Sequence, residues 1–280
     1  MPLVAALTDR AGMMVSPKAA RALGDKLGTR PVCAGPYRFV ERVAQGKIVF
    51  ERFADYWDKG SIHIDRVEFV PILDSTARLA SLRSGDLHMV ERASPTDLPE
   101  IRGDSRLKVV GVPELGYQMI PLNVANGPRA KTLADRRVRQ ALDLAVDRDT
   151  LITAVFNGEY IAGNQWVSPT NPYYNAKFPV RKRDVAKARQ LLKEAGQPNL
   201  AFTLIVPPER DRQEAAQIIQ AMLAEAGITM TIQTQENVTM LTNGRKGDFE
   251  AYFTFWSGRP DPDGNVFTHN TCKGAQNDSR

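Results

Sequence analysis

The sequence is poor in the residues from which most metal centres are built. It holds only two cysteines and three histidines among 280 residues. Cys33 and Cys272 form no CxxC pair, and His63, His88 and His269 are isolated from one another and from both cysteines. Spacings of this kind predict neither a metal site nor a cofactor, and we interpret each histidine as a surface or packing residue.

The motifs of common enzymes are also missing. The chain contains no GxSxG nucleophile elbow, no GxGxxG dinucleotide loop and no Walker phosphate loop. No sequence pattern identifies a candidate nucleophile with a general base beside it, so we expect no catalytic residues. The sequence therefore favours a protein that binds without turnover.

Long hydrophobic runs are absent as well. No stretch approaches the roughly 18 consecutive apolar residues that a membrane span requires. The first 20 residues include an apolar patch, but Asp9 and Arg10 interrupt it and no basic leader precedes it. We do not expect this segment to be a signal peptide, so either the protein is cytoplasmic or the natural chain begins further upstream.

What remains is the composition of an ordinary globular protein. Hydrophobic residues make up 42% and charged residues 25%, and 280 residues suffice for one large domain or two modest ones. The net charge of +5 comes from 37 basic and 32 acidic residues that are spread along the chain. The densest basic run, residues 181–183, lies just before a predicted helix, so we expect no nucleic-acid partner.

Residues 31 to about 123 predict short strands around one helix. That helix spans Ser75–Ser84, with Asp74 or Ser75 as its N-cap and Gly85 at its end. The hydrophobic alternation and the turn at Gly46 indicate a hairpin that further strands follow. The predicted strands are 38–43, 47–52, 66–71 and 87–91.

Residues 124 to 280 open with helices. Apolar residues from Asp135 to Val146 recur with the spacing of one helix face, which predicts a helix packed on the core. A second helix follows from Asp147 through Val155. A third is predicted over Asp184–Ala195, where Gly196 provides the stop.

From Ala201 the order changes to strand, helix, strand, strand. The segments are 201–206, 211–226, 229–234 and 249–255. Strands separated by a helix of this length normally pair in parallel through a right-handed crossover, and ligands bind beyond their carboxyl ends. Three polar loops are predicted to converge there: Pro207–Arg210, Glu236–Thr239 and Trp256–Asn265.

The third of these loops has the most informative sequence, FWSGRPDPDGN from Phe255 to Asn265. An aromatic run ends in a tight turn that carries Trp256, Arg259 and Asp261. Loops of this kind, held on a rigid rim, are suited to binding a polar organic ligand. A solvated turn after a buried strand is the alternative that the residue types leave open.

Six segments, taken in order, resemble the signatures of the family 5 extracellular solute-binding proteins. These are the peptide, dipeptide and nickel binding components of ABC importers. The resemblance covers nearly the whole chain. The segments are PVCAGPYRFVE (31–41), ERFADYW (51–57), ARLASLRSGDLHMVE (77–91), DRRVRQALDLAVDRDTLITAVFNG (135–158), DVAKARQLLKEAG (184–196) and FWSGRPDPDGN.

The resemblance implies an α/β fold of the periplasmic-binding-protein type II, peptide-binding subclass, with parts of two lobes built on mixed sheets. It identifies the chain as an internal piece of a longer, exported, periplasmic protein whose signal peptide lies outside this chain. Residues 1–30 would be the tail of an inserted domain and its connection, 31–123 part of lobe I, and 124–280 most of lobe II.

The function implied is capture of a small peptide, or a similar small polar or anionic solute, between the lobes and its delivery to a membrane permease. No cofactor or metal takes part, and a monomer is expected. Two alternatives remain open at this point. One is an α/β enzyme of hydrolase type, and the other is a periplasmic chaperone or signalling module that keeps the same clamp.

Site residues follow from matching positions. Arg210 stands where dipeptide-binding relatives carry an arginine for the ligand carboxylate, and Asn237 stands where they carry a tryptophan. Arg259 replaces an aspartate that neutralises the ligand amino group, which implies a solute with an anion there or an uncharged one. The alternative is that Arg259 points outward or pairs with Asp261. The expected ligand-binding set is Arg210, Asn237, Trp256, Arg259, Asp261, Glu209 and Glu236.

Cys272 lies in a C-x-G-x-x-N context. In related proteins such a cysteine pairs with another a short distance downstream. We therefore expect no disulfide between Cys33 and Cys272.

Overall fold

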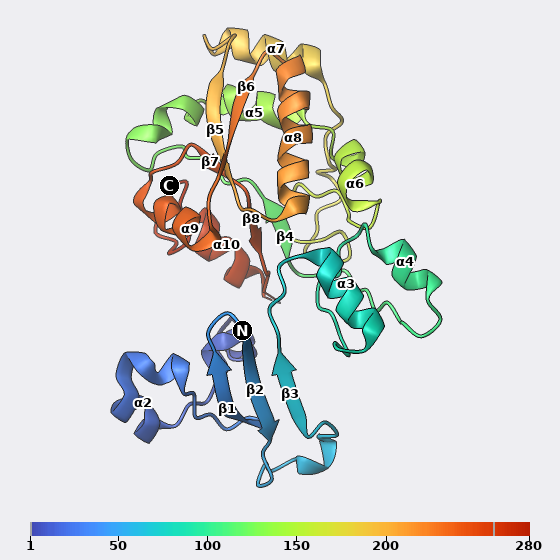
Figure 1. Ribbon diagram of the computed structural model, residues 1–280. Helices are drawn as coiled ribbons and strands as arrows, with labels where there is room; N and C mark the ends of the chain where they lie inside the picture. The colour runs from blue at the N-terminus through green and yellow to red at the C-terminus, as the bar shows by residue number, and fades with distance from the viewer. Residues whose placement is uncertain (1, 260) are drawn as a thin grey trace. The chain divides into compact units, whose positions relative to one another are not determined.

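The computed structural model describes residues 2–259 and 261–280, and the chain divides into two compact units, 1–89 and 90–280 (Figure 1). Pro260, in the predicted binding loop, lies outside the described residues. The division into lobes at residues 30 and 123 is a property expected of the whole protein, and it stays a prediction.

The first unit is built on a three-stranded antiparallel sheet in the order β1-β2-β3. The predicted hairpin is confirmed, because β1 pairs antiparallel with β2. The predicted helix is confirmed too, since the Asp74 carboxylate accepts from the Ala77 N–H at 2.7 Å and Gly85 ends the helix at φ +89°. The elements are α1 (Pro2–Ala6), α2 (Pro17–Leu23), β1 (Tyr37–Val43), β2 (Lys47–Arg52), β3 (Arg66–Phe69) and α3 (Ser75–Ser84), with 3₁₀ turns at Arg10–Gly12, Gly24–Thr29 and Lys59–Ser61.

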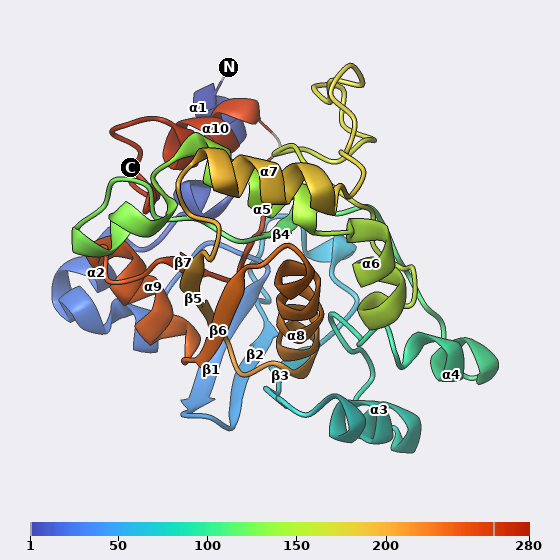
Figure 2. The same cartoon turned by 90° about the horizontal axis from the view of Figure 1, so that it is seen from above.

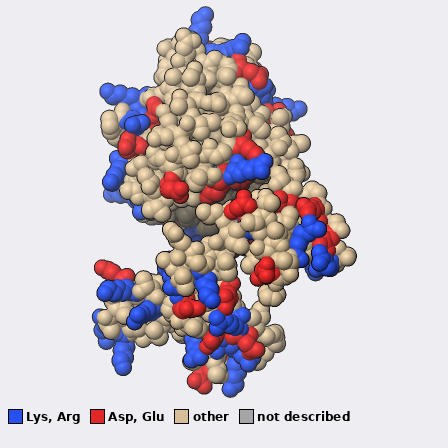
Figure 3. All heavy atoms as spheres, in the orientation of Figure 1, with Lys and Arg blue, Asp and Glu red and all other residues tan. Residues whose placement is uncertain are grey.

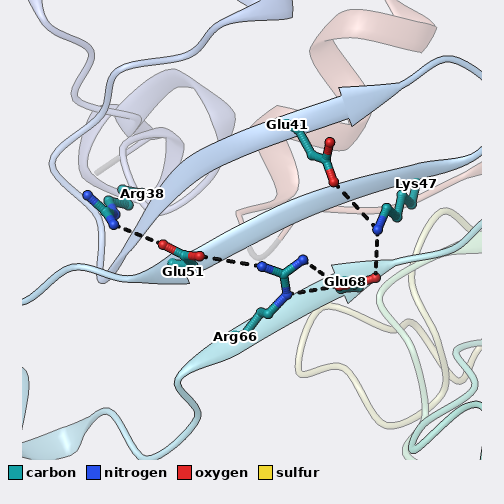
Figure 4. A network of polar contacts seen from close by, with 6 residues as sticks. All are labelled: Arg38, Glu41, Lys47, Glu51, Arg66 and Glu68. Atoms are coloured by element: carbon teal, nitrogen blue, oxygen red, sulfur yellow. Dashed lines mark hydrogen bonds and ion pairs between the residues drawn. The ribbon is translucent and has the colours of Figure 1, made fainter.

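The two faces of this sheet differ in chemistry because strand side chains alternate. One face carries an ion-pair network in which Glu51 accepts from both Arg38 and Arg66 (Figure 4). The opposite face carries three phenylalanines in edge-to-face contact, with ring centroids 6.0 Å apart in each pair. The network residues are Arg38, Glu41, Lys47, Glu51, Arg66 and Glu68, and the aromatic ones are Phe39, Phe50 and Phe69.

The prediction of a strand at 87–91 is wrong, because these residues form bends and irregular backbone that pairs with no strand. Strand-like alternation forms a strand only where a neighbour supplies the hydrogen bonds. The expectation of one helix between residues 31 and about 123 is wrong as well. A short helix, α4 (Leu98–Gly103), follows in the second unit, with Pro99 in its first turn.

The second unit contains the predicted parallel sheet. β5 (Ala201–Val206) pairs in parallel with β6 (Thr229–Thr234) and with β7 (Ala251–Tyr252), in the order β6-β5-β7. The single strand expected over 249–255 is corrected to two short ones, because the chain leaves β5 after β7. Beyond Phe253, β8 (Thr254–Trp256) pairs antiparallel with β4 (Tyr117–Met119).

Seven helices of the second unit are described. Aspartate side chains cap four of them: Asp135, Asp147, Asp184 and Asp261 each accept a backbone N–H from the first turn. The predicted helices α5 to α8 are confirmed to within two residues, whereas α9 and α10 were not predicted. Besides α4, they are α5 (Arg136–Ala145), α6 (Arg148–Phe156), α7 (Val185–Glu194), α8 (Arg210–Glu225), α9 (Asn237–Lys246) and α10 (Pro262–Asn270), with a 3₁₀ turn at Pro128–Leu133.

The main core lies between one face of this sheet and helices α5 to α8 (Figures 1 and 2). Leu204 and Val206 of β5 are fully buried on that face. On the other face Ile205 packs with Met240 of α9, Phe249 and Tyr252. Each fully buried aliphatic side chain stabilises the fold by roughly 1.5–3 kcal/mol, so burial of these side chains holds β5 firmly against the helices.

A buried asparagine joins segments that are distant in sequence. The fully buried Asn123 amide donates to the carbonyls of Asn126 and Phe249, each at 2.8 Å, and accepts from the Asn126 N–H at 2.9 Å. Asn126 in turn donates to the Asp278 carbonyl at 2.9 Å. The turn at 123–126 is therefore tied both to the strand region and to the segment after α10.

Polar side chains occupy the open edges of the parallel sheet. The Glu250 carboxylate accepts from the Thr203 N–H at 2.8 Å and from the Thr132 hydroxyl at 2.7 Å, where β7 is too short to pair with β5. On the outer edge of β6, the Gln220 side chain of α8 donates to the Met230 carbonyl at 2.6 Å. At both edges, side chains thus form hydrogen bonds with backbone groups that no neighbouring strand pairs.

Candidate functional site

The candidate site lies where the parallel strands end. β5, β6 and β7 run in one direction, so the segments that follow them start from the same edge of the sheet. Two of these segments are shorter than predicted. Arg210 is the first residue of α8 and Asn237 the first of α9, so the predicted loops 207–210 and 236–239 end in helix instead.

Glu209 and Asn237 bring the first two segments together. The Asn237 side chain donates to Glu209 Oε1 at 3.0 Å, which links the start of α8 to the start of α9. The Glu209 carboxylate also lies 3.9 Å from Arg212 Nη1, and its side chain is 41% exposed. Glu236, at the N-cap position of α9, is exposed. This part of the rim therefore presents carboxylate and amide groups to solvent.

Arg210 lies along its own helix. Its Nε donates to Glu214 Oε1 at 2.7 Å, four residues on, and its side chain is 85% exposed. An exposed ion pair of this spacing contributes only about 0.3–0.5 kcal/mol. The Arg210 guanidinium thus lies at the surface beside the Glu214 carboxylate.

The third segment begins at the tip of β8, where Trp256 pairs with Tyr117. The guanidinium of Arg259 lies over the indole ring, 4.6 Å from its centroid, and Nη1 donates to the Ser257 hydroxyl at 3.0 Å. Stacking of this type is a cation–π interaction. The structure therefore brings the predicted residues Trp256 and Arg259 together and half-buries both.

Asp261 has a local structural role. Its carboxylate accepts from the Asp263 N–H at 2.9 Å and so caps α10. The predicted loop 256–265 consequently ends at Asp261, and the remaining residues to Asn265 are helical. Asp261 thereby fixes where α10 begins.

Sequence reasoning missed two residues of α10 that contact Trp256. The Asn265 side chain accepts from the indole N–H at 2.8 Å and donates to the Arg259 carbonyl at 3.0 Å. The His269 ring packs edge-on against the indole, with centroids 4.3 Å apart, which confirms that this histidine is a packing residue. Their spacing of four residues could have placed them on one helix face, had α10 been predicted.

Phe255 has a comparable arrangement on the other face of β8. The Arg92 guanidinium lies 4.5 Å from its ring centroid. Gly116 packs so closely that a Cβ there would lie 2.5 Å from the ring. The two aromatic residues at the tip of β8 are thus each covered by an arginine.

Basic and acidic side chains are interspersed on the face drawn in Figure 3. Within residues 2–259 and 261–280, no group of three His, Cys, Asp or Glu side chains could hold a metal ion. Over the same ranges, no helix has both the length and the apolarity that a bilayer crossing demands. Cys33 and Cys272 are exposed free thiols.

Comparison with known proteins matches this chain to one family over almost its whole length. The family described as bacterial extracellular solute-binding proteins, family 5 Middle, matches residues 2–278. The glutathione-binding protein of Pectobacterium atrosepticum is 30% identical over 82% of this chain. The dipeptide-binding protein of Escherichia coli is 28% identical over 91% of it.

Solved structures show the same fold. The periplasmic binding protein DppA of Helicobacter pylori, in complex with the peptide STSA, superposes with a TM-score of 0.82 at 26% identity over 95% of this chain. The murein tripeptide binding protein of Escherichia coli gives 0.79 at 25% identity over 95%. These similarities confirm the predicted α/β fold of the periplasmic-binding-protein type.

The chain spans about half the length of the relatives that it matches. It covers 44% of the glutathione-binding protein and 48% of the dipeptide-binding protein. It covers 52% of the Helicobacter pylori structure and 53% of the murein tripeptide binding protein.

Proposed function

We propose that this chain, which belongs to the family 5 bacterial extracellular solute-binding proteins, is part of the substrate-binding component of an ABC importer. The whole protein would capture a peptide or another small polar solute and deliver it to a membrane permease. Relatives named for dipeptide, di/tripeptide and glutathione binding support a solute of this class. We further propose that the protein acts in the periplasm, as a monomer.

The observation that carries the proposal is the arrangement at the carboxyl ends of the strands. Two polar segments follow the parallel strands β5 and β6 at the same edge of the sheet. The hydrogen bond from Asn237 to Glu209 joins these segments. The Arg259 guanidinium, which follows β8 and stacks on Trp256 at the end of that strand, adds a flat, charged group. Polar side chains on a rigid rim are suited to holding a small polar solute.

The proposed ligand contacts are those expected from the sequence. The set is Glu209, Arg210, Glu236, Asn237, Trp256, Arg259 and Asp261. Within it, Arg259 decides which charge the solute carries nearby. A free ammonium group beside a guanidinium costs several kcal/mol, so we propose an anionic or uncharged group at this position.

The mechanism follows from closure around the solute. Contacts that both lobes make in the closed state, and that the open state lacks, shift the population toward the closed form. The permease would then recognise that form. Because members of this family are solute-binding transport proteins, the hydrolase alternative is not favoured, and the chaperone or signalling alternative has no observation in its support.

Calorimetry on the full-length protein tests the proposal. We expect N-acetyl-dialanine to bind at least as tightly as dialanine, and Arg259→Asp to reverse that order. Arg136→Asp, at an exposed position on α5, is the matched control and should change neither affinity. Clearly tighter binding of the free-amine dipeptide by the unaltered protein would refute the role of Arg259. Failure of a broad peptide and small-solute panel to bind would refute the transport function itself.

A further inference from the structure

Trp256 is held from three directions by side chains that come from two segments. Arg259 of the loop covers its ring at 4.6 Å, and His269 of α10 packs edge-on at 4.3 Å. Asn265, one turn before His269, accepts from the indole N–H at 2.8 Å. The position of the indole is therefore set by α10 as much as by its own strand.

Asn265 links the tryptophan to the binding loop. Its side chain is 1% exposed, and both ends of the amide are used: Oδ1 accepts from Trp256, and Nδ2 donates to the Arg259 carbonyl at 3.0 Å. A buried amide that lost either partner would leave a polar atom unsatisfied. Residues 256 and 259 are thus kept in a fixed relation by a side chain that contacts both.

His269 packs against the same indole with one ring nitrogen buried. Its Nε2 is buried and has no hydrogen-bond partner among the described residues, while the ring bonds to the main chain of Gln276. Burial lowers the pKa of His269, and the charge of Arg259 lowers it further. The Gln276 bond and the charge of Asp278 oppose this effect. A proton on Nε2 would place a charged N–H where no acceptor lies.

We infer that Asn265 and His269 are positioning residues for solute binding, and that protonation of His269 releases Trp256 and the Arg259 loop from their binding geometry. The imidazolium gains solvation only if its ring leaves the indole, and the edge-on contact is lost with it. The inference rests on the proposed function, because it takes Trp256 and Arg259 to be ligand contacts. Protonation of His269 therefore makes solute capture weaker at acidic pH.

A spectroscopic experiment tests the positioning without any solute. In this chain with Trp57→Phe and Trp166→Phe, Trp256 is the single emitting tryptophan. Between pH 8 and pH 5 we expect its quenching by neutral acrylamide to rise at least about twofold, because a half-buried indole becomes accessible. His269→Phe keeps an aromatic ring at the contact but cannot titrate, so it should abolish the pH dependence. Far-UV circular dichroism at each pH verifies that the fold persists.

Two outcomes of this experiment would overturn the inference. One is quenching that does not change with pH in the unaltered background. The other is a pH dependence that His269→Phe leaves intact. Either result stands whether or not the whole protein binds peptides, so the positioning role and the transport function can fail separately.

Substitution of Asn265 separates its two hydrogen bonds. Asn265→Asp keeps an acceptor for the indole N–H but loses the donor to Arg259, whereas Asn265→Ala loses both. We expect the ¹⁵N-labelled indole resonance of Trp256 to stay near its original position in the Asp variant and to move in the Ala variant. In the full-length protein, both should weaken N-acetyl-dialanine binding, by about fivefold for a single lost hydrogen bond. Unchanged affinity in both variants would contradict a positioning role.

Discussion

At the scale of single residues, His269 makes stability depend on pH. Its pKa in the folded chain is lowered by burial, from an ordinary value near 6.5. The unfolded chain therefore binds this proton more readily, so the free energy of unfolding is highest above about pH 6.5 and falls as the pH drops toward the folded pKa. Urea titrations at several pH values measure this fall.

One substitution assigns the effect to this histidine. His269→Phe should remove part of the loss between pH 7 and pH 5, because no imidazole then titrates against Trp256. A profile that His269→Phe shares with the unaltered chain would show that His269 does not contribute to the pH dependence.

The residue types at the site could be predicted only in part. FWSGRPDPDGN predicts that Trp256 and Arg259 belong to one ligand-binding loop. The structure brings the two side chains into contact, and their role in ligand binding stays a prediction. The position of Arg259 on the indole depends on the backbone of residues 257–259. Gly258 has φ +70° there, and its Cα lies close to the backbone of Leu115. Contacts between segments distant in sequence leave no local signal of this kind.

At the scale of elements, helix ends explain which segments could be predicted. α5, α6 and α7 each begin after an aspartate that caps them, and each carries apolar residues on its core face. α9 contains Asn, Thr and Gly residues that have weak helix propensity, and α10 opens with the turn-like sequence Pro-Asp-Gly-Asn. Tertiary packing, through Met240 in α9 and Asn265 in α10, overrides those local preferences.

The end of α9 allows a test of close packing. Gly247 has φ +76°, and a Cβ there would lie 2.3 Å from the Asn126 carbonyl oxygen. Gly196, after α7, has φ +73° but open space around it. Gly196→Ala should therefore cost only the left-handed strain, roughly 1–2 kcal/mol. Gly247→Ala should cost about 1–3 kcal/mol more, because Asn126 must move.

Urea unfolding of the two glycine variants measures this difference. Both glycines lie in the second unit, so the same transition reports on both. Equal losses of stability would mean that the turn at 123–126 yields without cost, and that the hydrogen bonds of Asn123 do not fix its position.

At the scale of the whole molecule, the two units differ in how much core they contain. Among the described residues of the first unit, only Val49 and Leu79 are buried hydrophobics, whereas the second unit has a continuous core. Burial of apolar surface is the main source of stability. We expect amide hydrogen exchange, followed by mass spectrometry, to show lasting protection in β5, α5 and α8 and rapid exchange in β1 to β3.

Salt separates the contributions within the first unit. The charged network around Glu51 and Arg66 is partly exposed, so about 1 M salt screens it and should speed exchange in β2 and β3 further. Exchange in β5 should respond little, since its neighbours are apolar. Protection of β1 to β3 equal to that of β5 would show that six surface charges and three phenylalanines suffice to stabilise that sheet.

The side chain of Gln220 has a consequence for how copies of this chain behave at high concentration. A bare outer strand offers its carbonyls as a template on which another molecule can add a strand, and repeated addition leads to fibres. With the Met230 carbonyl already taken at 2.6 Å, an incoming strand would have to displace the glutamine before it could pair along β6. One amide on a neighbouring helix thereby disfavours self-templated aggregation from this edge.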